Sequence, residues 1–186
     1  MIILGSSSPR RIELLKEITR DFIIMKPPFN ERDIDIKAKD YALVEAKNKA
    51  NSLKNAAKPQ DFLICCDTMV IYEDIIFNKP IDLEDAKKTL AFLSGKTHKV
   101  ITGYIIIHGD KTIERQVETD VTFNELDENT INEYVTKCDV LDKAGSYGIQ
   151  YNDIVPIIKE IKGSLTNVIG FPIDEIKEDL LALGAL

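Results

Sequence analysis

Apolar residues along this chain recur at two spacings, one typical of helices and the other of strands. Residues three and four positions apart line one face of a helix, as from Leu43 to Leu53 through Ala46 and Ala50. Glycines at 95 and 184 are typical of helix ends. These signals predict helices over 9–19, 39–56, 127–137, between 82 and 95, and between 172 and 184.

Apolar runs and alternating patterns predict the strands. The run Phe62–Cys66 is typical of a buried central strand, and we expect it to end at Asp67, at the edge of the sheet. Turn residues at Gly109-Asp110 predict a hairpin of two long strands. The expected strands are 2–5, 22–25, 62–66, 69–72, 75–77, 96–108, 111–123 and 154–161. Because helices and strands do not alternate strictly, we predict an α/β fold with a mixed, twisted sheet flanked by helices.

Composition narrows the class of protein and its partners. The chain has 186 residues, 44% hydrophobic and 30% charged, which predicts a single globular domain over residues 1–186. The net charge of −7 argues against nucleic acid or an anionic membrane as partner. Three cysteines and two histidines show no disulfide framework and no zinc spacing. Without a signal peptide or an apolar run near ~18 residues, we expect a cytoplasmic protein.

The segment Gly5-Ser6-Ser7-Ser8-Pro9-Arg10-Arg11 lies between a predicted strand and a predicted helix. Ser8 suits the N-cap position and Pro9 the first helical position. The start of such a helix presents N–H groups and a partial positive charge, and two arginines add planar donor groups. The segment therefore indicates a phosphate site. The alternative is a capped helix with two solvated arginines.

Three further segments carry polar residues suited to chemistry. Asp67-Thr68 follows a buried strand, where it is either a turn aspartate or a site carboxylate. Lys79 precedes Pro80 and so has an extended backbone that can aim its side chain. Residues 142–150, Asp-Lys-Ala-Gly-Ser-Tyr-Gly-Ile-Gln, predict a glycine-bearing loop that lets the backbone approach a ligand.

Taken in order, these segments resemble the signature of the Maf family of nucleoside triphosphate pyrophosphatases. The opening segment is similar to the family's Ala-Ser-x-Ser-Pro-Arg-Arg, with Gly5 where alanine is usual. Asp-Thr-x-Val matches at Asp67, Lys-Pro at Lys79, and Asp-Lys-Ala-Gly-x-Tyr-Gly-Ile-Gln at 142–150. Residues 94–103 match Ser-Gly-x-x-His-x-Val-x-Thr-Gly, and 163–172 resemble the family's closing motif, with Leu165 in place of a frequent tyrosine.

The resemblance implies a fold, a reaction and a set of site residues. The fold would be similar to that of inosine triphosphate pyrophosphatases, with a central cleft between two lobes. The reaction would split a nucleoside triphosphate into the monophosphate and pyrophosphate. Asp67 is implied as general base and Lys79 as a catalytic cation; Glu31 and Asp67 would hold a divalent metal, Mg²⁺ or Mn²⁺. The implied substrate-binding residues are Ser6, Arg10, Arg11, Lys49, Lys79 and Gln150.

The resemblance also separates two substrate branches. Thr68 resembles the branch that prefers dTTP and UTP, whereas the branch that prefers a methylated GTP often has glutamine after the aspartate. A role in clearing modified or excess nucleotides would follow. The alternatives left open are a 7-methyl-GTP-type pyrophosphatase and a nucleotide-binding regulator of cell division with little turnover. The sequence also leaves the oligomeric state open, a homodimer included.

Overall fold

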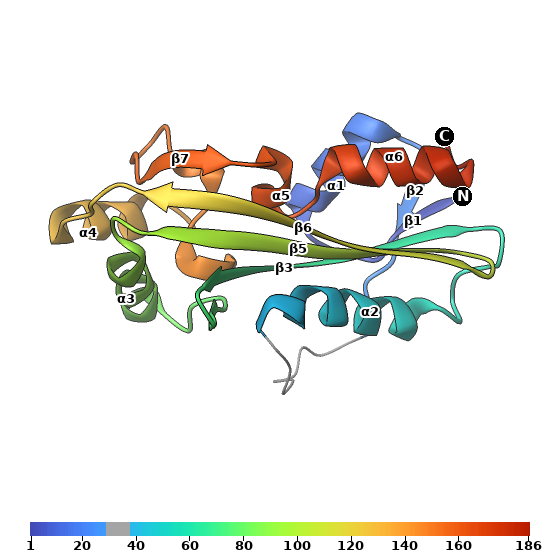
Figure 1. Cartoon of the computed structure of the whole chain (residues 1–186), viewed down its shortest axis with the longest axis horizontal. Coiled ribbons are helices and arrows are strands. Elements are labelled where there is room, and N and C mark those ends of the chain that lie inside the picture. The colour runs from blue at the N-terminus through green and yellow to red at the C-terminus, as the bar shows by residue number, and fades with distance from the viewer. Residues whose placement is uncertain (29–37) are drawn as a thin grey trace.

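The computed structural model describes residues 1–28 and 38–186 of the chain, which form one mixed sheet covered by helices (Figure 1). Within these residues the sheet has seven strands in the order β2-β1-β3-β5-β6-β7, and β4 pairs with β3 beside this path. The strands are β1 Ile2–Leu4, β2 Phe22–Ile24, β3 Phe62–Tyr72, β4 Ile75–Phe77, β5 Thr97–His108, β6 Lys111–Phe123 and β7 Ile158–Lys162.

Only the pairs that β1 makes with β2 and β3 are parallel among the described strands. The predicted hairpin is confirmed, because His108 pairs with Lys111 across the turn at 109–110. The three long strands β3, β5 and β6 run through the middle of the molecule, with helices above and below them in the view of Figure 1. The prediction of a mixed sheet flanked by helices is therefore confirmed.

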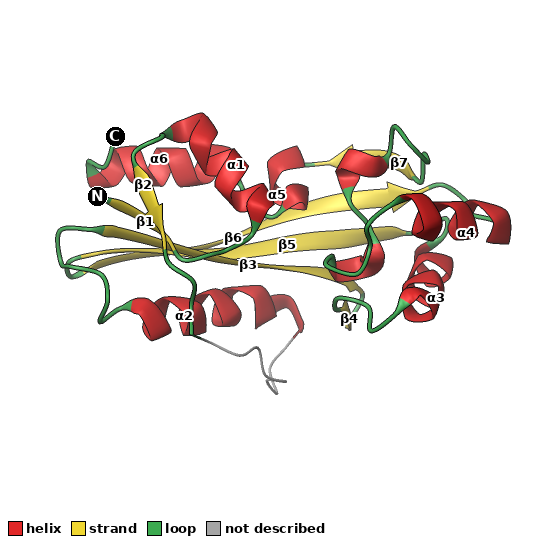
Figure 2. Ribbon diagram, turned by 180° about the vertical axis from the view of Figure 1, so that it is seen from behind, coloured by secondary structure: helices red, strands yellow, loops and turns green. Residues whose placement is uncertain are grey.

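Helices cover both faces of this sheet (Figure 2). One face carries α2, and the other carries α1, α5 and α6, while α3 and α4 pack together at the far end of the long strands. No helix in the described residues is both long and apolar enough to cross a bilayer. The helices are α1 Pro9–Ile18, α2 Tyr41–Leu53, α3 Leu83–Leu93, α4 Glu128–Lys137, α5 Leu165–Ile169 and α6 Ile173–Leu183, with short 3₁₀ turns at Ala38–Asp40, Ala144–Ser146 and Ile149–Tyr151.

Side chains alternate along β3, so successive residues face the helices on opposite faces of the sheet. Leu63 and Cys65 pack in the cluster beneath α2, whereas Ile64 and Cys66 pack in the cluster beneath α1 and α6. Because side chains alternate between the faces of a strand, Asp67 faces α2 and the next residue faces α1. The helix α2 on one face and the helix α1 on the other therefore lie next to neighbouring residues of β3.

The structure corrects several element boundaries predicted from the sequence. β3 is a single strand through Asp67, so this carboxylate lies inside the sheet and not after a strand end, because pairing with β5 is continuous from Leu63 to Ile71. Ala42, not Leu43, lies on the buried face of α2, which ends at Leu53. The strand expected over 154–161 lies at 158–162, and the short helix α5 was not predicted.

A glycine allows α2 to lie directly on the sheet beside Asp67. Gly103 of β5 is the partner of Asp67 in the ladder. A Cβ atom at Gly103 would lie 2.3 Å from the backbone nitrogen of Leu43 in α2. Any side chain here would push the helix outward, so this glycine sets how closely Lys49 of α2 can approach β3.

Candidate active site

A cavity of about 630 Å³ opens where the start of α1, the middle of β3 and the loop 142–150 meet. This volume lies within the range of small-molecule sites. Seven residues predicted to act in the site line it, whereas Glu31 lies outside the described residues. The seven are Ser6, Arg10, Arg11, Lys49, Asp67, Lys79 and Gln150.

The turn before α1 leaves the first N–H groups of that helix uncapped. Ser8 takes the N-cap position and Pro9 the first helical position, as predicted, but the Ser8 side chain makes no capping hydrogen bond. The backbone N–H of Ser8 donates instead to Ser6 Oγ at 3.2 Å. Since the Ser8 hydroxyl does not occupy these donors, the start of α1 can receive an anion from the cavity.

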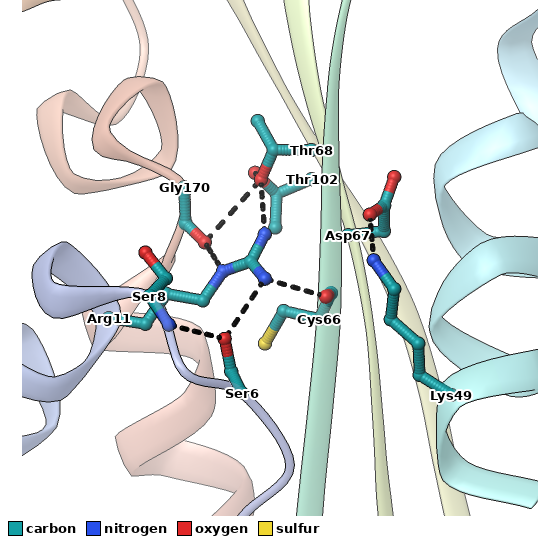
Figure 3. Close-up of polar contacts among 9 residues, drawn as sticks. All are labelled: Ser6, Ser8, Arg11, Lys49, Cys66, Asp67, Thr68, Thr102 and Gly170. Atoms are coloured by element: carbon teal, nitrogen blue, oxygen red, sulfur yellow. Dashed lines mark hydrogen bonds and ion pairs between the residues drawn. The ribbon is translucent and has the colours of Figure 1, made fainter. Parts of the chain in front are cut away.

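On the α2 side of β3, Asp67 forms an ion pair with Lys49 (Figure 3). Both side chains are largely buried, with exposed fractions of 13% and 12%. Their charges therefore interact with little solvent screening. The pair places a carboxylate and an ammonium together in the cavity wall.

On the α1 side of β3, the Arg11 guanidinium is bound to protein acceptors (Figure 3). Its Nε donates to the carbonyl oxygen of Gly170 at 2.9 Å, and its Nη2 to Thr68 Oγ1 at 3.1 Å. Its Nη1 donates to the carbonyl oxygen of Cys66 at 2.9 Å and to Ser6 Oγ at 3.4 Å. Arg11 thus joins α1, β3 and the end of α5.

The remaining cations lie nearer the rim of the cavity. Arg10 Nη1 is 3.0 Å from Asp142 Oδ2, which links α1 to the loop 142–150. Asp142 is also paired with the buried Lys143. Although partial burial alone would raise the pKa of Asp142, Lys143 and Arg10 lower it. Lys79 is exposed and makes no ion pair within the described part of the chain.

Cys65, Cys66 and His98 are not among the residues that line the cavity, and their surroundings disfavour nucleophilic or acid–base chemistry. Burial raises the pKa of Cys65 to about 12 and that of Cys66 to about 11, so both thiols are protonated at neutral pH. Burial lowers the pKa of His98 to about 4, and its Nε2 shares a 2.8 Å hydrogen bond with the hydroxyl of Tyr147. His98 is therefore a neutral, buried residue. The described carboxylates of the cavity wall are Asp67 and Asp142.

The donor set of the cavity fits a hard divalent cation with few protein ligands. Within residues 1–28 and 38–186, no three side chains of His, Cys, Asp or Glu cluster as a preformed metal site. Mg²⁺ usually binds through one or two carboxylates, substrate phosphates and water, so it needs no such cluster. Asp67 supplies one oxygen donor group on the wall of the cavity.

Sequence reasoning missed several residues that build this site. The Thr102 hydroxyl and the Gly170 carbonyl oxygen contact the Thr68 hydroxyl, but the motifs at 94–103 and 163–172 that contain these two residues predict no role for them. Asp142 belongs to a motif recognised in the sequence, yet its pairing with Arg10 was not predicted. The motifs were the available signal, because these partners lie far apart along the chain.

Gly5 has no room for the alanine of the family signature that its segment resembles. A Cβ atom there would lie 2.3 Å from Sγ of Cys65 and 3.0 Å from Cδ1 of Leu53. Gly5→Ala should therefore lower the free energy of unfolding by about 1–3 kcal/mol, the usual cost of overpacking. Urea denaturation would measure this change.

A double-mutant cycle tests the cause. Cys65→Ala in the same chain removes the clashing sulfur, so the pair should be more stable than the sum of the two single changes predicts. Cys66→Ala is the matched control, because Cys66 packs on the opposite face of the sheet. If Cys65→Ala and Cys66→Ala restored the free energy of unfolding of the Gly5→Ala variant equally, the clash with the Cys65 sulfur would not be the cause.

Comparisons with known proteins show the family and the fold to which this chain is similar. The chain is 38% identical over 195 residues to a dTTP/UTP pyrophosphatase of Clostridium acetobutylicum, covering 98% of each chain. It is 46% identical over 176 residues to a dTTP/UTP pyrophosphatase of Pyrococcus furiosus, covering 92% of this chain and 90% of the relative. In fold it is similar to the Ham1 protein of Staphylococcus aureus, with a TM-score of 0.54 and 14% identity over 98% of each chain. The model of the family described as "Maf-like protein" matches residues 1–183. Because the family model and both relatives cover nearly the whole chain, the protein belongs to the Maf family.

Proposed function

We propose that this protein hydrolyses nucleoside triphosphates, dTTP and UTP foremost, to the monophosphate and pyrophosphate. The single observation that carries the proposal is one cavity that joins the uncapped start of α1, several cations and the Asp67 carboxylate. The names of the relatives from C. acetobutylicum and P. furiosus support the same substrates. Clearance of modified or excess nucleotides in the cytoplasm belongs to the same proposal.

The cations of the cavity suit a triphosphate. Arg10 and Lys79 at the rim, with the first N–H groups of α1, would receive phosphate oxygens. Arg10 is held by Asp142 in this structure, and a phosphate would compete with that carboxylate for the guanidinium. Lys79 would offset negative charge that develops on the leaving pyrophosphate. Gln150 remains a proposed substrate-binding residue on the loop 142–150.

Asp67 is the proposed general base. It would accept a proton from the water that attacks the α-phosphorus, while the bond to the oxygen bridging the α- and β-phosphates breaks and pyrophosphate leaves. Lys49 lies beside Asp67 and would fix its carboxylate and approach the same phosphates. The base would thus act from the α2 side of β3, with the phosphates at the start of α1.

A divalent cation, Mg²⁺ or Mn²⁺, is proposed as cofactor. Asp67 would hold it together with Glu31, which lies outside the described residues. The bound cation would neutralise phosphate charge and polarise the phosphoryl group. Chelation of divalent metal should therefore abolish pyrophosphate release.

The proposed preference for pyrimidines rests on the resemblance of Thr68, the residue after Asp67, to the branch that prefers dTTP and UTP, and Thr68 lines the cavity. In this structure its hydroxyl is held by Arg11 and Thr102, at 3.1 and 2.9 Å. A site with fixed polar groups discriminates strongly against a base that leaves them unpaired.

A panel of triphosphates tests the proposed function directly. With Mg²⁺ present, dTTP and UTP should give the highest kcat/KM values and pyrophosphate as the product. Each canonical nucleoside triphosphate and 7-methyl-GTP should be tested as substrate, with pyrophosphate and orthophosphate measured in separate assays. Release of single orthophosphate would contradict the bond that we assign, and a clear lead for 7-methyl-GTP would place the protein in the other substrate branch.

A further inference from the structure

The two arginines at the start of α1 have different surroundings, although they are neighbours in the sequence. Arg10 reaches the rim and is paired with Asp142 of the opposite loop. Arg11 lines the cavity from the α1 side of β3 and makes four hydrogen bonds to acceptors of the protein. A guanidinium has five N–H donors, so Arg11 has one left for a ligand.

Two of the four acceptors of Arg11 flank Asp67 in the sequence. One is the carbonyl oxygen of Cys66, at 2.9 Å, and another is the hydroxyl of Thr68, at 3.1 Å. Asp67 itself points to the other face of β3, toward Lys49 (Figure 3). Arg11 therefore hydrogen-bonds to β3 on the face opposite the Asp67 carboxylate and does not contact that carboxylate.

The hydrogen bonds of Arg11 continue through Thr68 and Thr102 to Asn167. Thr102 Oγ1 donates to the carbonyl oxygen of Asn167 at 3.2 Å, so it accepts the 2.9 Å hydrogen bond from Thr68. Thr68 in turn accepts from Arg11. Hydrogen bonds thus run in one direction, from α1 through β3 and β5 to α5. Thr102 is fully buried and is not among the residues that line the cavity.

We propose that Arg11 is a positioning residue that fixes Asp67 relative to the start of α1, and that phosphate binding falls to Arg10. This inference rests on the proposed function, in which Asp67 activates water and the start of α1 receives phosphate. Reacting groups must be held closely, since a shift of about 1 Å can cost ~10²-fold in rate. Arg11 connects the two groups in one side chain, because it belongs to α1 and bonds to the residues flanking Asp67.

Arg11→Lys tests the proposal because it keeps the charge and removes the planar fork. One ammonium cannot reach the Cys66 carbonyl, the Thr68 hydroxyl and the Gly170 carbonyl in their separate directions. We expect kcat for dTTP to fall by about 10²-fold. KM should change little, as should the affinity for the non-hydrolysable α,β-methylene analogue of dTTP, measured by calorimetry.

Arg10→Ala is the matched comparison, from the neighbouring position of the same helix. It should weaken binding of the analogue by roughly tenfold or more, as expected for loss of a charge-assisted hydrogen bond. If Arg11→Lys instead weakens analogue binding as strongly and keeps kcat, Arg11 is a phosphate ligand and the proposal is wrong. A purely structural role would lower the melting temperature but leave kcat per folded molecule unchanged, which also contradicts it.

Thr102→Val provides a second variant in case Arg11→Lys does not fold. Valine keeps the shape of threonine, and the change acts on Thr68 from outside the cavity. A lower kcat with unchanged analogue affinity would support the proposal, and an unchanged kcat would overturn it. The calorimetric measurement needs no turnover, so weaker binding of the analogue by Arg11→Lys would contradict this proposal whether or not the wild type is active. A wild-type protein that releases no pyrophosphate would contradict the proposed function, on which the positioning role of Arg11 rests.

Discussion

Replacing Asp67 by asparagine should lower kcat for dTTP by about 10²–10⁴-fold, the contribution typical of a positioned general base. Asparagine keeps the shape of the side chain and can still accept a hydrogen bond from Lys49, so the chain should fold. Stability should nevertheless fall by about 1–3 kcal/mol, because the change weakens a largely buried ion pair. Steady-state pyrophosphate assays and urea denaturation would measure the two effects separately.

Asp120→Asn is the matched control for this prediction. Asp120 lies in β6 of the same sheet, where it is partly exposed and paired with Lys99, and it is not among the residues that line the cavity. Its replacement should leave kcat close to that of the wild type. A variant of Asp67 that keeps more than about a tenth of the wild-type rate would exclude Asp67 as the base.

The second large effect is expected from Lys79→Ala. Lys79 is exposed at the rim of the cavity, and no ion pair ties it to the described residues. Loss of a cation that stabilises charge in the transition state should lower kcat/KM by about 10²-fold. The free energy of unfolding should change by no more than about 0.5 kcal/mol, as is usual for a surface position.

Lys88→Ala tests whether this effect is specific. Lys88 is also exposed, on the nearby helix α3, and it is not among the residues that line the cavity. The Lys88 variant should match the wild type in kcat/KM and in stability. Equal losses in both lysine variants would assign the effect to overall charge, and a parallel loss of stability in the Lys79 variant would assign it to the fold.

Local patterns were sufficient to predict most helices and strands. The spacing of apolar residues predicted α1, α3, α4 and α6 and the long hairpin of β5 and β6 to within a few residues. This succeeds because the period of a pattern follows from which face of an element is buried. The prediction failed where a polar pair interrupted an apolar run, at Asp67-Thr68, because the sequence alone did not show that β5 pairs with β3 through this point.

The sequence also predicted which residues gather in the site, largely through the resemblance of its motifs. Seven of the predicted site residues line one cavity, although they come from segments spread between positions 6 and 150. The sequence did not show which role each of these residues has. Arg10 and Arg11 are adjacent and chemically alike, and either could have faced a phosphate.

Only the tertiary structure distinguishes the contacts of Arg10 from those of Arg11. The acceptors of Arg11 on β3 and after α5 lie between 55 and 159 positions away along the chain. Continuity of β3 put Asp67 on the face toward α2 and Thr68 on the face toward α1, since side chains alternate along a strand. Gly103 then let α2 lie close enough for Lys49 to reach Asp67. By itself the sequence determined the elements and the chemical groups, because both follow from local residue types. Only the packed structure determined which groups face the cavity and which hold it in shape, because that depends on strand register and on contacts between distant segments.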